Sequence, residues 1–121
     1  METIVDDNNV KQLTFSDYQR LALTTAKYPN VGSNYVYPLF GLAGESGEIF
    51  EKVKKVQRDN DGVFTEEKKL ELKKEIGDTF WYLAALCSEF KFDMGDVATL
   101  NLQKLFSRRE RDVIGGSGDN R

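Results

Sequence analysis

The sequence predicts an all-α fold of four helices. Apolar residues recur at helical spacing along most of the chain, and no segment alternates apolar and polar residues convincingly enough to form a strand. Both prolines, Pro29 and Pro38, fall in one stretch rich in turn-forming residues, so they break the helical pattern at one place. A chain of 121 residues has room for one compact domain and too little for two, so residues 1–121 are expected to form a single unit.

The first helix is expected from Tyr18 to Ala26, after a polar leader over residues 1–14. Ser16 with Asp17 can cap its amino terminus, because short polar side chains accept hydrogen bonds from the first free backbone amides. The stretch over residues 28–38 follows, and it combines both prolines with three tyrosines. This composition indicates a loop that packs against the domain and can cover a site.

Three longer helices are expected after this loop. The first runs from Leu39 to about Val56 and ends at a cluster of turn-forming residues. The next begins at Thr65 and spans Glu66 to Phe90, passing from a charged half into an apolar half that can enter a core or a subunit interface. The last is capped by Asp93 and ends near Arg109. Residues 110–121 are expected to form a flexible tail or a lid.

Charge and missing residue types exclude several classes of function. Twenty acidic against seventeen basic residues give a net charge of −3, so no nucleic-acid polymer is expected as a partner. The chain has no histidine, and its single cysteine, Cys87, lies in an apolar run and is expected to be a buried core thiol. Any chemistry therefore depends on carboxylates, lysines, arginines and hydroxyls.

The location of the protein is predicted from its hydropathy. The first residues have neither the basic start nor the apolar run of a signal peptide. No stretch approaches the roughly 18 uninterrupted apolar residues that a membrane span requires. A cytoplasmic protein without membrane contact is therefore expected.

Two short acidic pairs are the candidate metal ligands. Glu45 with Glu48, and Glu75 with Asp78, are each spaced i to i+3. On a helix this spacing places both side chains on one face, about 5 to 6 Å apart at Cβ, which is close enough to share one hard cation. Four converging carboxylates repel one another and need such a cation, and Mg²⁺ or Mn²⁺ suits oxygen-only ligands.

The alternative is that these acids are ordinary solvated neighbours on helix surfaces. On that interpretation the chain is a non-catalytic helical dimer that binds a nucleotide or a protein partner. The two interpretations differ in whether Glu75 and Asp78 bind a metal ion.

A polar stripe with two cations is expected on the last helix. Its members, Asn101, Lys104 and Arg108, lie within about 60° of one another around the helix axis. Such a stripe is usually a solvated face, but beside carboxylate-held Mg²⁺ it becomes an arrangement that polyphosphate chemistry uses. Lys52 on the second helix can add to this clamp. Further cationic candidates are Arg109, Arg111 and Arg121.

Two other features can contribute to a substrate site. Gly41, Gly44 and Gly47 recur in the predicted second helix, which indicates close approach of another helix or of a substrate. Gln19, the tyrosine-rich loop and Trp81 can stack on a base or form hydrogen bonds with it, although packing is the commoner role of such residues.

The acidic segments resemble a known family. GLAGESGEIFEKVKK followed by KKEIGDTFWYLAAL is similar to the E-x-x-E and E-x-x-D signature of the MazG-like all-α nucleoside triphosphate pyrophosphatases, with residues 49–74 between the two pairs. Further on, NLQKLFSR resembles the N-x-x-K-L-x-x-R element of that family, and GSGDNR resembles the tail of many of its small stand-alone members. The resemblance covers about residues 15–121.

The resemblance implies a fold, an assembly and a reaction. The fold is a four-helix MazG-like one in which helices of two subunits combine into a bundle, within a homodimer or a homotetramer. The reaction is Mg²⁺-dependent hydrolysis of a (d)NTP to the monophosphate and pyrophosphate, for sanitation or reshaping of a nucleotide pool. By the same resemblance, Glu45, Glu48, Glu75 and Asp78 would hold the metals, and one of them would activate the attacking water. The residues that would bind phosphate and sugar are Asn101, Lys104 and Arg108.

Overall fold

The computed structural model describes residues 12–121 and is all-α, as the sequence predicts. Its helices are α1 (Phe15–Ala22), the short 3₁₀ helix η2 (Leu23–Thr25), α2 (Val36–Asn60), α3 (Glu66–Glu89) and α4 (Met94–Glu110), and the described range contains no strand. Most of the predicted polar leader, residues 1–11, lies outside the described part of the chain. No helix in that part is long and apolar enough to cross a membrane.

The first helix begins earlier than expected, and its predicted cap is wrong. Thr14 is the cap, and its side-chain oxygen accepts a hydrogen bond from the Asp17 amide at 3.0 Å. Ser16 lies inside the helix and instead donates to Asp93 Oδ1 at 2.8 Å. The helix also ends earlier, at Ala22, where one turn of 3₁₀ helix replaces the expected final turn.

The second helix is longer at both ends than the predicted span. It begins at Val36, so that Pro38 lies in its first turn, where a missing backbone N–H costs no helical hydrogen bond. The Asn34 side chain accepts from the Tyr37 amide at 3.2 Å and supports this start. At the other end the residues expected to form the turn continue the helix as far as Asn60. The chain leaves the helix at Asp61, which has a left-handed conformation with φ of 52°.

The spans of α3 and α4 agree with the prediction to within about a residue, and both predicted caps are confirmed. Thr65 accepts from the Lys68 amide, and Asp93 accepts from the Asp96 amide. Both caps act within one turn, so the local sequence determines them.

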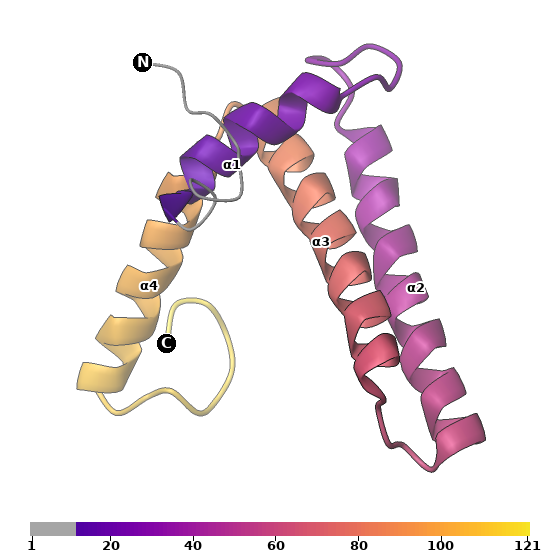
Figure 1. Cartoon of the computed structure of the whole chain (residues 1–121). Helices are drawn as coiled ribbons and strands as arrows, with labels where there is room; N and C mark the ends of the chain where they lie inside the picture. Colours follow the sequence, from indigo (N-terminus) through magenta and orange to yellow (C-terminus); the bar gives the residue numbers. More distant parts are fainter. Residues whose placement is uncertain (1–11) are drawn as a thin grey trace.

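The helices form an open arrangement in which α2 and α3 lie side by side and antiparallel (Figure 1). Gly41 permits this approach, because a Cβ at that position would overlap the aromatic ring of Tyr82 on α3. Neither Gly44 nor Gly47 has any such neighbour, so close approach is required at only one of the three glycines. Helix α1 crosses the end of α3, and α4 diverges from the α2–α3 pair toward its carboxyl end (Figure 1).

The loop between η2 and α2 packs against the end of α3, as its tyrosines predict. The Glu89 carboxylate accepts a hydrogen bond from the Tyr28 hydroxyl and from the backbone amides of Gly32 and Asn34, both at 2.8 Å. Burial opposes ionisation of Glu89, but these three donors outweigh it and hold the pKa of the carboxyl below its ordinary value. The loop is thereby fixed beside the α2–α3 pair.

Candidate active site

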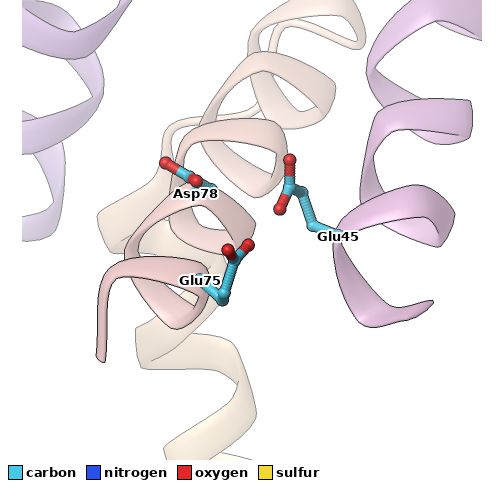
Figure 2. A group of neighbouring side chains, drawn as sticks. All are labelled: Glu45, Glu75 and Asp78. Atoms are coloured by element: carbon cyan, nitrogen blue, oxygen red, sulfur yellow. The ribbon is translucent and has the colours of Figure 1, made fainter. Parts of the chain in front are cut away.

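Three carboxylates meet between α2 and α3. Glu45 extends from α2 toward Glu75 and Asp78, which lie one turn apart on α3 (Figure 2). Each residue offers one carboxylate oxygen, and these oxygens all lie within 4.8 Å of one another. The structure therefore brings together three of the four predicted acidic residues.

Local sequence explains this convergence. The i to i+3 spacing of Glu75 and Asp78 places both on the same side of α3. Glu45 follows Gly41 by one helical turn, so it projects from α2 close to the point where the missing side chain lets α3 approach. The absence of a side chain at Gly41 thus permits the close helix approach at which the carboxylates meet.

The charge of these three acids is only partly compensated. Glu45 is half-buried, and its Oε2 atom is fully buried with no hydrogen-bond partner among the described residues. Burial raises the pKa of the Glu45 carboxyl, and hydrogen bonding with Glu75 and repulsion by Asp78, Glu75 and Glu48 raise it further. The oxygens of three neighbouring acids, one of them buried without a donor among the described residues, form a suitable ligand set for a hard divalent cation.

Two other predicted site residues, Glu48 and Lys52, lie on α2 near these acids. Glu48 is exposed on α2 and is outside the group of three, although its charge acts on Glu45. Its assignment as a metal ligand stays a prediction. Lys52 extends toward α3, where its Nζ atom lies 3.8 Å from Glu75 Oε1. The structure therefore places the predicted phosphate-binding lysine beside the acidic group.

A pocket of about 470 Å³ adjoins the carboxylates and has aromatic walls. Glu45 and Asp78 line it on one side, and Tyr28 and Tyr37 stack in parallel with ring centroids 4.8 Å apart. Trp81 meets Tyr82 edge to face and donates its indole N–H to Thr25 Oγ1 and the Ala22 carbonyl. The rings are thus held in place by packing and hydrogen bonds, and Thr25 and Lys27 complete the lining.

Thr25 and Lys27 were not predicted as site residues. Thr25 is the last residue of η2 and Lys27 lies just after it, where no helical periodicity continues that would indicate the direction of a side chain. Their only local signal is their position just before the tyrosine-rich loop.

Gln19 lies outside this pocket and has a structural role. Its amide nitrogen donates to Ser88 Oγ and to the Phe92 carbonyl, both at 2.9 Å, and its oxygen accepts from the Met94 amide at 2.8 Å. These bonds join α1 to the turn between α3 and α4. All of its usual hydrogen-bonding atoms are engaged there, so the predicted contact with a base is not supported by this geometry.

The stripe on α4 does not lie at the acidic group of the same chain, because α4 diverges from α3 (Figure 1). Asn101 is exposed, and Lys104 pairs with Asp119 of the tail at 3.3 Å. Arg108 is only 5% exposed, and its guanidinium donates to the backbone carbonyls of Gly118 and Asp119. Within one chain, two of the three stripe residues therefore contact the tail.

The remaining candidates have other surroundings. Arg109 lies over the Phe106 ring, with Cζ 4.7 Å from its centroid, and Arg111 donates to the backbone oxygen of Arg121. Cys87 is half-buried rather than fully buried as expected. Burial, with a smaller effect of Asp93, raises the pKa of its thiol, which disfavours a nucleophilic role.

The chain is similar to a known family and to a phage protein. A family model described as the MazG nucleotide pyrophosphohydrolase domain matches residues 39–113, which include both acidic pairs and the α4 stripe. The Gene 37 protein of Mycobacterium phage L5 is 47% identical over 109 residues, covering 86% of this chain and 96% of that protein. No solved structure matches the chain.

Proposed function

The chain belongs to the MazG nucleotide pyrophosphohydrolase family, and we propose that it hydrolyses a (d)NTP to the monophosphate and pyrophosphate with Mg²⁺. One observation carries this proposal. Three carboxylates from two helices converge beside an aromatic pocket, and one of their buried oxygens has no partner among the described residues. Mn²⁺ offers the same preference for oxygen ligands and is the expected substitute.

Glu45, Glu75 and Asp78 are the proposed metal ligands, and the resemblance adds Glu48 as a fourth. A cation held by these residues would polarise phosphate oxygens and would neutralise the charge that develops on the departing pyrophosphate. Glu48 lies outside the group of three and is exposed, so its carboxylate is available to accept a proton from the attacking water. Lys52, beside Glu75, is positioned to neutralise phosphate charge at the same place.

The aromatic pocket is the proposed nucleoside site. A nucleobase is flat and stacks favourably on aromatic side chains, and the pocket is lined by four of them. The rings adjoin Glu45 and Asp78, so a base in the pocket leaves the triphosphate next to the carboxylates. We propose no preference among bases.

A second copy of the chain is proposed to complete the site. Large apolar side chains lie exposed on two helices, with Phe40 and Phe50 on α2 at 70% and 72% and Leu100 on α4 at 68%. Helix α4, which carries the stripe, diverges from the α2–α3 pair that carries the acids (Figure 1), so we propose that the stripe serves the site of a neighbouring chain. A homodimer or homotetramer would satisfy both observations. The proposed location of the nucleotide pool on which it acts is the cytoplasm.

The test is product analysis with each of the eight common (d)NTPs. Purified protein is incubated with Mg²⁺, and monophosphate, diphosphate, phosphate and pyrophosphate are separated by anion exchange. The proposal predicts monophosphate with pyrophosphate in equal amounts, lost in Glu75→Gln and retained in Glu71→Gln. Glu71 is the matched control, because it lies one turn away on α3 and pairs with Lys68 instead of facing Glu45. Turnover that persists in Glu75→Gln would contradict the assignment, and absence of any turnover would favour the non-catalytic binding module.

A further inference from the structure

The carboxyl-terminal segment folds back onto the cationic stripe of α4. Asp119 Oδ1 lies 3.3 Å from Lys104 Nζ and 3.6 Å from the Arg108 guanidinium. The carbonyls of Gly118 and Asp119 accept hydrogen bonds from the same Arg108 group at 3.3 and 2.9 Å. One carboxylate thus lies next to both cations, and two carbonyl oxygens bond Arg108.

Arg121 holds this segment in shape. Its guanidinium donates to the carbonyls of Val113, Ile114, Gly115 and Gly118, at distances from 2.6 to 3.2 Å. The tight path also needs glycine at two places, because Gly116 and Gly118 have φ of 92° and 90°. The result is a closed loop over residues 111–121 of the tail, here called the strap. The strap leaves α4 at Arg111 and contacts α4 again through Gly118 and Asp119.

The strap satisfies the two cations incompletely. The Arg108 side chain is almost fully buried, but its Nε–H has no hydrogen-bond partner among the described residues. The Asp119 side chain is 85% exposed, so its pairing with Lys104 and Arg108 is open to water and to competing anions. An oxyanion with several oxygens could accept hydrogen bonds from Lys104 and from Arg108 Nε–H at the same time. The Asp119 carboxylate lies next to Lys104 and Arg108 but leaves Arg108 Nε–H without a partner among the described residues.

We propose that Asp119 is an internal competitor that occupies the oxyanion seat formed by Lys104 and Arg108, and that the strap must be displaced before a pyrophosphate group can bind there. The chemical class of the ligand, a pyrophosphate or polyphosphate, rests on the proposed function. The competition itself rests only on the contacts between the strap and α4. Arg121 is a positioning residue, since it acts on the seat through the strap.

The experiment measures binding of inorganic pyrophosphate to the full chain by titration calorimetry at low salt, with EDTA present so that the carboxylates of α2 and α3 hold no cation. Asp119→Asn removes the competing charge and keeps the shape of the side chain. It is expected to tighten pyrophosphate binding about two- to fivefold, the size of effect typical of an exposed ion pair. Asp112→Asn is the matched control, since it makes the same charge change in the same segment without contacting Lys104 or Arg108 and should change affinity much less.

A second variant separates competition from simple structural support. Arg121→Ala frees the strap, so it should also tighten binding, whereas a strap that merely supports the seat would make the same substitution weaken it. The proposal is overturned if Asp119→Asn leaves affinity unchanged or lowers it, if Asp112→Asn tightens binding equally, or if the wild type and both variants fail to bind pyrophosphate. Nucleotide turnover is measured in parallel. If no (d)NTP is hydrolysed while pyrophosphate binding responds as expected, the proposed function fails and the strap proposal stands.

Discussion

The acidic group between α2 and α3 and the cationic stripe of α4 differ in how their charges are compensated. Glu45, Glu75 and Asp78 face one another, with Lys52 3.8 Å from Glu75 and one buried oxygen that has no donor among the described residues. Lys104 and Arg108 instead have an acid and two carbonyls supplied by their own chain. We propose that the first region takes a cation from outside, whereas the second already holds an internal anion. Uncompensated charge therefore points to a ligand more directly than charge alone.

The largest expected effect comes from removing one charge of the uncompensated group. Glu45→Gln should lower turnover by about 100-fold or more, because a metal ligand contributes several kcal/mol to transition-state stabilisation. The metal-free protein should nevertheless become more stable, by about 1 kcal/mol, since a buried carboxylate without a donor is unfavourable. Steady-state kinetics and denaturant unfolding in EDTA check the two effects. A variant that is both active and destabilised would contradict the comparison.

The pH dependence of the free energy of unfolding tests whether the charge of Glu45 destabilises the metal-free protein. The folded-state pKa of Glu45 is raised above its ordinary value of 4.5, so the folded chain binds a proton there more tightly than the unfolded chain does. The metal-free protein should then lose stability as pH rises from about 4.5 through the folded-state pKa. Glu45→Gln should lose that component of the dependence, which denaturant unfolding at several pH values would measure.

The second effect tests the approach of the two helices that carry the acids. Gly41→Ala should destabilise the protein by about 1 to 3 kcal/mol, because the new methyl group overlaps the Tyr82 ring and forces the helices apart. Gly47→Ala is the control on the same helix, where a Cβ meets nothing and alanine favours helix by up to about 1 kcal/mol. Thermal unfolding that ranks the two variants in the opposite order would show that Gly41 does not set the helix spacing.

A smaller effect is expected at a carboxylate that is fully compensated. Glu89→Gln should destabilise the protein by about 1 to 2 kcal/mol at neutral pH, because it weakens charge-assisted hydrogen bonds to the loop. The pKa of Glu89 is lowered, so its contribution is present above pH 4.5 and is lost as pH falls through the lower folded-state value. The same chemical change is thus predicted to have opposite signs at Glu45 and Glu89. Equal signs in denaturant unfolding at pH 7 would refute the explanation by compensation.

The smallest effect is expected at the strap. Asp119→Asn should leave the unfolding temperature unchanged within error, because its ion pairs are exposed to water. Thermal unfolding in low and high salt checks this. A clear loss of stability would mean that the strap supports the fold rather than competing for the seat.

Local signals in the sequence were sufficient for much of the fold. Thr65 and Asp93 cap their helices through bonds within one turn, so the starts of α3 and α4 could be predicted. The start of α1 could not, because Ser16 bonds to Asp93 across the fold and leaves the cap to Thr14. Pro38 was expected to lie in a loop, yet a proline in the first turn is compatible with a helix.

The site shows the same division. The i to i+3 spacing was enough to place Glu75 with Asp78, since it depends on one helix. The participation of Lys27 and the contact between Arg108 and the strap depend on where loops return, which no periodic pattern in the sequence encodes. Resemblance assigned Arg108 to phosphate, whereas its burial beneath the strap became visible only in three dimensions.

Direct measurement of metal binding tests the central claim most directly. Mn²⁺ is titrated into the wild type, Glu75→Gln and Glu71→Gln, and free Mn²⁺ is followed by electron paramagnetic resonance. The account predicts that the wild type and Glu71→Gln bind the ion equally well and that Glu75→Gln binds it at least about tenfold more weakly, since one charged ligand is lost. Equal binding by all three proteins would contradict the claim that the acids between α2 and α3 form the metal site.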